Sequence, residues 1–275
     1  MINYTEQLTL LMQDLVDRIP ALSFIEIADV VVFARHGRSN AQGAFATCHC
    51  LTLPPSDPGY YFWRDRATGR VTRKSEWFVT KSPTVMLGTR QVKYLISFSL
   101  PRFCDQSFDR SRKERFYRGM DAPWIAKLDT VVHELYHIDP GHNGIRRLDR
   151  GDGTHSPHCH SPRFFAKVSE MVAMYLDTRP DPAAYDFLRY DFNALESRYG
   201  GIVGASFRSF PSYPQRFIER LAIQPAHNAP LYQADVVPVP ASRQPTRYTE
   251  NDLQLREFNR SSSRHLIRKG RFKAA

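Results

Sequence analysis

The sequence predicts an α+β fold in which a short, mostly antiparallel sheet packs on one central helix and a basic C-terminal tail follows. Three observations support this prediction. Apolar residues recur at three- and four-residue steps between residues 121 and 138, the period of a helix with one buried face. Residues 92–100 alternate apolar and polar side chains, the period of a strand. Prolines become frequent from Pro211 onward and basic residues beyond 243, which is typical of a linker and a charged tail.

The composition is that of an ordinary globular protein. Of the 275 residues, 42% are hydrophobic and 24% are charged, and the length suffices for a substantial core. No run of 18 apolar residues occurs, and the N-terminus carries Glu6, Gln7 and Asp14 among its leucines, so the sequence predicts neither a membrane span nor a signal peptide. We therefore expect a cytoplasmic protein without a membrane partner. Four cysteines are too few for a disulfide scaffold.

The N-terminal part is expected to contain one helix and one strand. Residues 4–19 carry apolar side chains on one helical face, and Asn3 and Glu6 form a capping pair at its start. Pro20 ends this helix because proline cannot continue the helical hydrogen bonding. Residues 25–33 are apolar and rich in β-branched side chains, which predicts a buried strand.

Further strands are expected before the central helix. Residues 45–53 predict a strand that contains a Cys-His-Cys triplet at 48–50. The triplet lacks the C-x₂₋₄-C spacing of structural metal sites, so we interpret its cysteines as reduced thiols. Aromatic runs at 60–63 and 76–80 predict a hairpin, and 92–100 predicts the strand beside the central helix.

The central helix is bounded by clear start and stop signals. Asp121 is expected to cap its first turn, where Pro123 is well tolerated. The Asp-Pro-Gly triplet at 139–141 ends it. A charged helix or turn at 109–118 leads into it.

The central helix carries an H-E-x-x-H motif formed by His133, Glu134 and His137. The two histidines are four residues apart, so on a helix they share one face and both imidazoles can reach the same Zn²⁺ ion. Glu134 follows the first histidine and can act on metal-bound water as a general base. The motif therefore predicts zinc as the cofactor.

A catalytic zinc site needs a third protein ligand, and the sequence offers several. The irregular stretch 142–162 contains His155, His158 and His160, and Glu170 lies on the helix expected at 163–177. Metzincin spacing is excluded, because the glycine and histidine which that pattern requires at positions 140 and 143 are proline and asparagine here.

The residues around the third candidate resemble a known family. His160-Ser-Pro-Arg-Phe-Phe165 is similar to the H-S-P-x-F-W element that follows H-E-L-x-H in YgjP-like, SprT-related metal-dependent hydrolases. The span Val131 to Phe165 resembles a family of phage metallopeptidases, with H-E-L-x-H-I-x-P, a glycine- and arginine-rich stretch and a second histidine cluster. The resemblance covers residues 92–177.

The resemblance implies a zincin-like, minimal gluzincin-like fold. It implies His133, His137 and His160 as metal ligands and Glu134 as the general base. A longer loop than in YgjP-like chains separates His160 from His137, so His155, His158 and Glu170 stay open as alternatives.

The C-terminal third is expected to hold two helices and a linker. One helix is predicted at 183–199, ending at a pair of glycines. The proline-rich stretch 224–247 indicates a linker. A helix at 249–268 would align four basic residues in one stripe: Arg256, Arg260, Arg264 and Arg268. We therefore divide the chain into a zincin-like domain at 1–222 and a proline-rich linker with a basic tail, disordered or helical, at 223–275.

The charge favours association with polyanions through this tail. The net charge is +10, and residues 243–275, with nine basic and three acidic side chains, contribute +6 of it. Nucleic acid is therefore an expected partner of the basic stripe.

Two functions are compatible with these patterns. The first is a zinc metallopeptidase that hydrolyses peptide bonds, in which Tyr136 and Tyr175 are candidate partners of the oxyanion and the edge of the 92–100 strand binds extended substrate. The alternative is a nucleic-acid-binding protein with a structural zinc site, closed by two further ligands from the set His155, Cys159 and His160. A structural site has no need of a carboxylate beside its first ligand, so Glu134 favours the peptidase.

Overall fold

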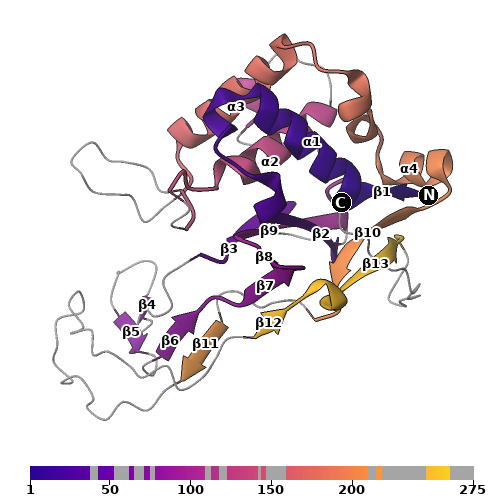
Figure 1. Ribbon diagram of the computed structural model, residues 1–275. Coiled ribbons are helices and arrows are strands. Elements are labelled where there is room, and N and C mark those ends of the chain that lie inside the picture. The colour runs from indigo at the N-terminus through magenta and orange to yellow at the C-terminus, as the bar shows by residue number, and fades with distance from the viewer. Residues whose placement is uncertain are drawn as a thin grey trace.

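A computed structural model provides the structure of the protein (Figure 1). It describes residues 1–37, 43–52, 62–64, 71–74, 78–108, 113–117, 123–141, 144–146, 159–209, 215–218 and 246–260. This part of the chain is α+β, with helices α1, α2 and α3 on one side of a central sheet and several small sheets on the other (Figure 1). None of the described helices is long and apolar enough to cross a membrane.

Four α-helices lie in the described residues: α1 (Tyr4–Arg18), α2 (Trp124–Tyr136), α3 (Pro162–Asp177) and α4 (Phe192–Tyr199). The expected helices at 4–19 and 163–177 and the central helix are thus confirmed. The capping role of Asp121 lies outside the described residues, and α2 begins after Pro123 without a side-chain cap.

The central sheet contains β2 (Val30–Gly37), β9 (Tyr94–Pro101) and β3 (Ala46–Cys50), in the order β2-β9-β3. Strand β2 is parallel to β9 and β3 is antiparallel to it, so the sheet is mixed rather than mostly antiparallel as predicted. All eight residues of β9 are buried, because this strand is central and covered on both faces. Strand β3, not β9, therefore forms the sheet edge beside α2.

A second sheet joins the two ends of the chain. It contains β1 (Ile2–Asn3), β10 (Ile202–Phe207) and β13 (Leu253–Phe258), with β10 in the middle. Strand β10 was not predicted. It lies against α1 and β2 so closely that a Cβ atom on Gly204 would stand 3.1 Å from Thr5 Cγ2 and 3.3 Å from Ala34 Cβ. Only glycine fits there without displacing a neighbour.

Shorter strands complete the structure on the lower side of Figure 1. They form three groups: β12 (Arg247–Tyr248) with β7 (Thr84–Leu87) and β8 (Arg90–Gln91); β4 (Phe62–Arg64) with β5 (Val71–Lys74); and β6 (Phe78–Lys81) with β11 (Gln215–Ile218). The predicted hairpin between 60–63 and 76–80 is wrong, since β4 pairs with β5 and β6 pairs with the distant β11.

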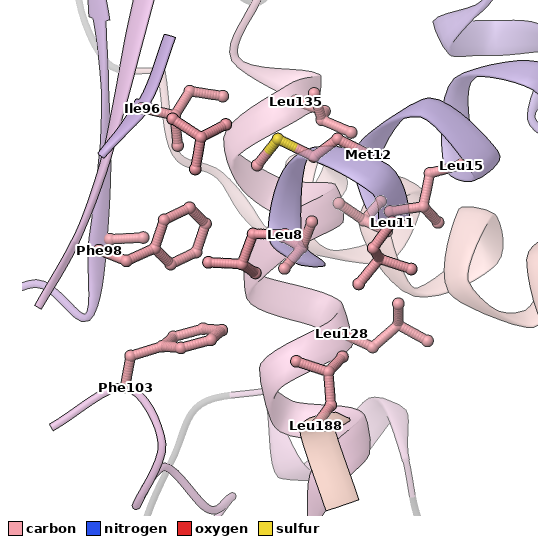
Figure 2. Packing of buried hydrophobic residues seen from close by; sticks show 14 of the residues in the cluster. Leu8, Leu11, Met12, Leu15, Ile96, Phe98, Phe103, Leu128, Leu135 and Leu188 are labelled. Atoms are coloured by element: carbon pink, nitrogen blue, oxygen red, sulfur yellow. The ribbon is translucent and has the colours of Figure 1, made fainter. Parts of the chain in front are cut away.

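The main core lies between the central sheet and the helices. Figure 2 shows Leu8 and Met12 of α1 facing Ile96 and Phe98 of β9, with side chains of α2 behind them. Each fully buried side chain of this size contributes roughly 1.5–3 kcal/mol through removal from water. A second cluster on the opposite face of the sheet includes Tyr248 and other residues contributed by β2, β9, β10, β12 and β13.

The predicted helix at 249–268 is wrong in its described part. Leu253–Phe258 is strand β13, which pairs along its whole length with β10, because the backbone groups of a sheet strand need a partner strand. Residues 246–260 thus belong to the folded structure, and the expected boundary after residue 222 does not separate a domain from a tail. The proline-rich segment 219–245 lies outside the described residues.

Two other expected elements differ at their starts. The strand expected at 25–33 begins only at Val30, after a 3-10 turn at Ile27–Asp29. The helix expected at 183–199 begins only at Phe192, where the side chain of Asp191 accepts a hydrogen bond from the backbone N–H of Ala194. It ends as predicted at Gly200, which adopts a left-handed conformation with φ of 68°.

Candidate metal centre

Helix α2 places the two histidines of the motif on one face. His133 and His137 are one helical turn apart, and both side chains are buried. Arg146 closes the C-terminal end of the helix: its backbone N–H donates to the carbonyl of His137 at 2.8 Å, and its Nε donates to the carbonyl of Tyr136 at 2.8 Å. A cation bound to the last carbonyls of a helix stabilises the orientation of the residues there.

The start of α3 positions the third histidine. The side chain of Ser161 caps the helix by accepting a hydrogen bond from the backbone N–H of Phe164 at 3.2 Å, and Pro162 occupies the first turn. His160 immediately precedes this cap, so its backbone is fixed by the helix start. Unlike His133 and His137, His160 is exposed.

The three histidines converge through their Nε2 atoms. These atoms are 2.9 Å apart between His133 and His160, 3.0 Å between His160 and His137, and 3.1 Å between His137 and His133. An imidazole nitrogen has one lone pair in the plane of the ring, so it cannot point at two neighbours at once. A metal ion placed between the three Nε2 atoms accepts the lone pair of each of them.

The spacing suits a small ion with tetrahedral coordination. Nitrogen ligands at ~2.0–2.1 Å from tetrahedral Zn²⁺ are separated from one another by roughly 3.3–3.4 Å. The three Nε2–Nε2 distances are only a few tenths of an ångström shorter. His133, His137 and His160 can therefore hold a metal ion.

Two phenylalanines of α3 pack against the histidine rings. The ring of Phe164 stacks on His137 with centroids 4.9 Å apart and meets His133 edge-on at 4.9 Å, whereas Phe165 stacks on His160 at 5.7 Å. The Nδ1 atoms of His133 and His137 are buried and have no hydrogen-bond partner within the described structure. Ring packing rather than outer hydrogen bonding therefore orients these two histidines.

Desolvation and a nearby positive charge favour the neutral form of the three histidines. Desolvation lowers the pKa of His133 well below its usual value, that of His137 to about 3, and that of His160 to a lesser degree. The positive charge of Lys113 lowers all three further. Neutral imidazoles have the free lone pair that metal binding requires.

Glu134 is buried between α2 and the edge strand β3. Burial raises the pKa of its carboxyl group to about 7, and the positive charge of Lys113 and the nearby backbone of Cys48 oppose this rise. Strand β3 is bonded to β9 through Phe45 and Leu51, so the intervening even-numbered residues direct their backbone groups away from β9. The N–H of Cys48 is therefore available to Glu134.

Of the other proposed ligands, those that the structure describes do not join the histidine group. Glu170 is exposed and forms an ion pair with Lys167 at 2.6 Å. His155 and His158 lie outside the described residues. Cys159 Sγ is 3.9 Å from Nδ1 of His160, the ring nitrogen opposite the one that joins the group.

The residues of the Cys-His-Cys triplet do not converge on one point. Its residues alternate along β3, so Cys48 and Cys50 share one face and His49 lies on the other, with its Nε2 3.4 Å from Ser97 Oγ. The cysteines are free thiols, as predicted.

The predicted arginine stripe is not present on a helix. Arg256 lies on β13 with its guanidinium over the ring of Phe258, and Arg260 forms an ion pair with Asp105 at 2.9 Å. The remaining members of the stripe, Arg264 and Arg268, lie outside the described residues.

One charged group near the centre was not identified from the sequence. Lys113 binds the carboxylate of Asp129, which also accepts a hydrogen bond from the hydroxyl of Tyr117 at 2.7 Å. The sequence does contain one indication of a charged partner here: Asp129 lies one helical turn before His133, on the face of α2 that carries the histidines.

Fold and site together define an α+β protein with a candidate three-histidine metal centre. Comparison of the chain with models of protein families, with curated proteins and with solved structures finds no match. The resemblance to phage metallopeptidases and YgjP-like hydrolases therefore stays a prediction.

Proposed function

We propose that the protein is a zinc-dependent metallopeptidase with a zincin-like domain. The observation that carries the proposal is the convergence of three Nε2 atoms within 2.9–3.1 Å of one another, next to a buried glutamate. The resemblance of the motif and of the segment at 160–165 to phage and SprT-related metallopeptidases agrees with it.

Three neutral imidazoles suit zinc and leave one of its four coordination positions for water or substrate. A zinc ion held by these residues would supply a Lewis acid that polarises a carbonyl group and lowers the pKa of water. The exposure of His160 favours a catalytic zinc site, because substrate must reach the open side of the centre.

Glu134 serves as the general base. Its carboxylate accepts the proton of the attacking water and then returns it to the nitrogen of the leaving amine, so that one water molecule is consumed for each peptide bond. Burial raises the pKa of this carboxyl group, the direction that brings it closer to neutral pH and helps it both to accept and to return a proton.

The edge of β3 is the expected substrate-binding strand. Its even-numbered residues direct backbone groups away from β9 and toward the side on which Glu134 lies. An extended peptide that adds to this edge would lie beside the histidines. This replaces the expectation that the 92–100 strand binds substrate, since both edges of β9 are already paired.

A structural zinc site in a nucleic-acid-binding protein is less well supported. Such a site is closed by four protein ligands, whereas three gather in the described part of the chain. Arg260, one of the residues expected to bind nucleic acid, is already paired with Asp105.

The variant Glu134→Gln tests the proposal. Wild-type protein should contain about one zinc per chain, which elemental analysis measures, and should cleave members of a peptide library, which mass spectrometry detects. Glu134→Gln should keep zinc and lose cleavage, because the amide cannot accept the proton. Glu170→Gln, which removes an exposed carboxylate on α3, is the matched control and should retain both properties. Equal cleavage by Glu134→Gln and wild type would refute the proposal.

A further inference from the structure

A buried ion pair lies beside the histidine group. The ammonium of Lys113 binds Oδ1 of Asp129, and the hydroxyl of Tyr117 donates to Oδ2 of the same carboxylate at 2.7 Å. The side chains of Lys113 and Asp129 are only 16% and 2% exposed. Because both carboxylate oxygens are engaged, the position of the ammonium is fixed rather than averaged over rotamers.

Packing connects this ion pair to the metal ligands. The Lys113 ammonium is 5.9 Å from the ring centroid of Phe165, and that ring stacks on His160 at 5.7 Å and lies 5.9 Å from His133. On the other side, Asp129 precedes His133 by one turn of α2. The positive charge also acts on His133, His137, His160 and Glu134, lowering the pKa of each.

The two tyrosines expected to assist the reaction make other contacts in the structure. The hydroxyl of Tyr175 donates to Asp14 at 2.6 Å. The ring of Tyr136 packs on Phe164, with the guanidinium of Arg146 4.3 Å from its centroid. Unlike these tyrosines, Lys113 carries a positive charge, which can attract a negative charge formed near the histidine group.

We propose that Lys113 is a further catalytic residue, whose ammonium stabilises the oxyanion formed from the carbonyl group of the scissile peptide bond. The inference rests on the proposed peptidase function. Water forms a bond to the carbonyl carbon while Glu134 takes its proton, and the π electron pair of the C=O bond moves onto oxygen beside Lys113. When that pair returns, the C–N bond breaks and the proton passes from Glu134 to the amine. Asp129 and Tyr117 are positioning residues in this account.

The test compares Lys113→Met, Lys113→Arg and, as matched control, the exposed Lys167→Met in the cobalt-substituted protein. The visible spectrum of cobalt reports the binding of inorganic phosphate, a tetrahedral anion. Lys113→Met should bind phosphate ~10–100-fold more weakly than wild type, because a hydrogen bond to a charged group is lost. Its kcat should fall ~10²–10³-fold, the usual effect of removing an oxyanion donor, with little change in KM. Lys113→Arg should recover part of both losses.

Measurement of metal affinity distinguishes oxyanion stabilisation by Lys113 from a purely structural role of this residue. Lys113→Met should bind cobalt as tightly as wild type in chelator competition, since Lys113 is not a ligand. Lys113→Met/Asp129→Asn removes both charges and so guards against misfolding caused by an unpaired buried carboxylate. It should show the same loss of phosphate binding and kcat.

The result that would contradict the role of Lys113 differs from the result that would contradict the proposed peptidase function. Unchanged phosphate affinity in a cobalt-loaded Lys113→Met or double variant overturns the role of Lys113, whether or not the protein cleaves peptides. Absence of bound cobalt in wild type would overturn the proposed function and the role of Lys113 together.

Discussion

The backbone of Cys48, on the edge strand β3, lies beside the carboxyl group of Glu134 and opposes the rise in its pKa that burial causes. This contact joins the edge of the central sheet to the helix that carries the two histidines of the motif. The proposed general base is therefore buried against the strand where we expect an extended peptide to bind.

The core between α1 and the sheet should dominate stability. Leu11→Ala should lower the free energy of unfolding by ~2–5 kcal/mol, because its side chain is fully buried and leaves a cavity. The neighbouring Leu10, which is 58% exposed, is the matched control, and Leu10→Ala should change it by less than ~0.5 kcal/mol. Urea denaturation of the two variants measures the difference. Equal effects would contradict the placement of α1.

Strand β13 should be required for folding. Truncation after Ile223 removes β12 and β13, leaving β10 without its antiparallel partner and removing Leu253 and Phe258 from the two cores. We expect this truncated protein to unfold or aggregate, since loss of a single buried phenylalanine costs ~3–5 kcal/mol. Truncation after Arg260 keeps both strands and should give a wild-type thermal transition. A cooperative transition at the wild-type temperature in the shorter protein would contradict the pairing of β10 with β13.

The helices could be predicted because their signals are local. The period of apolar residues identified α1, α2 and α3, and the Ser-Pro pair at 161–162 marked the start of α3. Strand β10 was missed because its small residues give no strand pattern of their own and fit only against α1 and β2. Strand β13 was missed because arginines at 256 and 260 have the helical spacing, although Leu253 and Leu255 alternate as in a strand.

Within the site, too, local sequence patterns could be recognised and contacts between separate segments could not. His133, Glu134 and His137 are recognisable from spacing within one helix, and His160 from its place before a helix start. The partners of Glu134 and Asp129 come from segments distant in sequence, so no local pattern identifies Cys48 or Lys113 as part of the centre.

The cap of α3 should influence metal affinity. Ser161→Ala removes the hydrogen bond to the N–H of Phe164, at a cost of ~1 kcal/mol, and frees the backbone that holds His160. We expect zinc affinity to fall by up to ~5-fold, the factor that corresponds to this energy. Ser161→Asp, which can also cap the helix, should keep wild-type affinity. Chelator competition measures both variants, and an unchanged affinity in Ser161→Ala would show that the cap does not position His160.

The metal-free protein should lose stability in acid because its histidines are buried in the neutral form. The pKa of His137 is lowered from 6.5 to about 3, so the unfolded chain binds the proton more tightly than the folded one. The stabilisation is complete above pH 6.5 and declines as the pH falls toward 3, with a slope approaching ~1.4 kcal/mol per pH unit for this group. Denaturation in the presence of a chelator at several pH values measures the slope.

His137→Asn provides the comparison for this pH dependence, since asparagine does not titrate. Its stability should decline less steeply than that of wild type between pH 6.5 and the acid range. Identical slopes in the two proteins would mean that His137 is not buried in the neutral form.

The most direct test of the account is the zinc affinity of single alanine variants at His160, His155 and His158, measured by chelator competition. We expect His160→Ala to weaken zinc binding by orders of magnitude, as His133→Ala and His137→Ala should, because all three Nε2 atoms meet at one point. His155→Ala and His158→Ala should bind zinc as wild type does. Wild-type affinity in His160→Ala, with a large loss in either of the other two, would contradict the three-histidine centre.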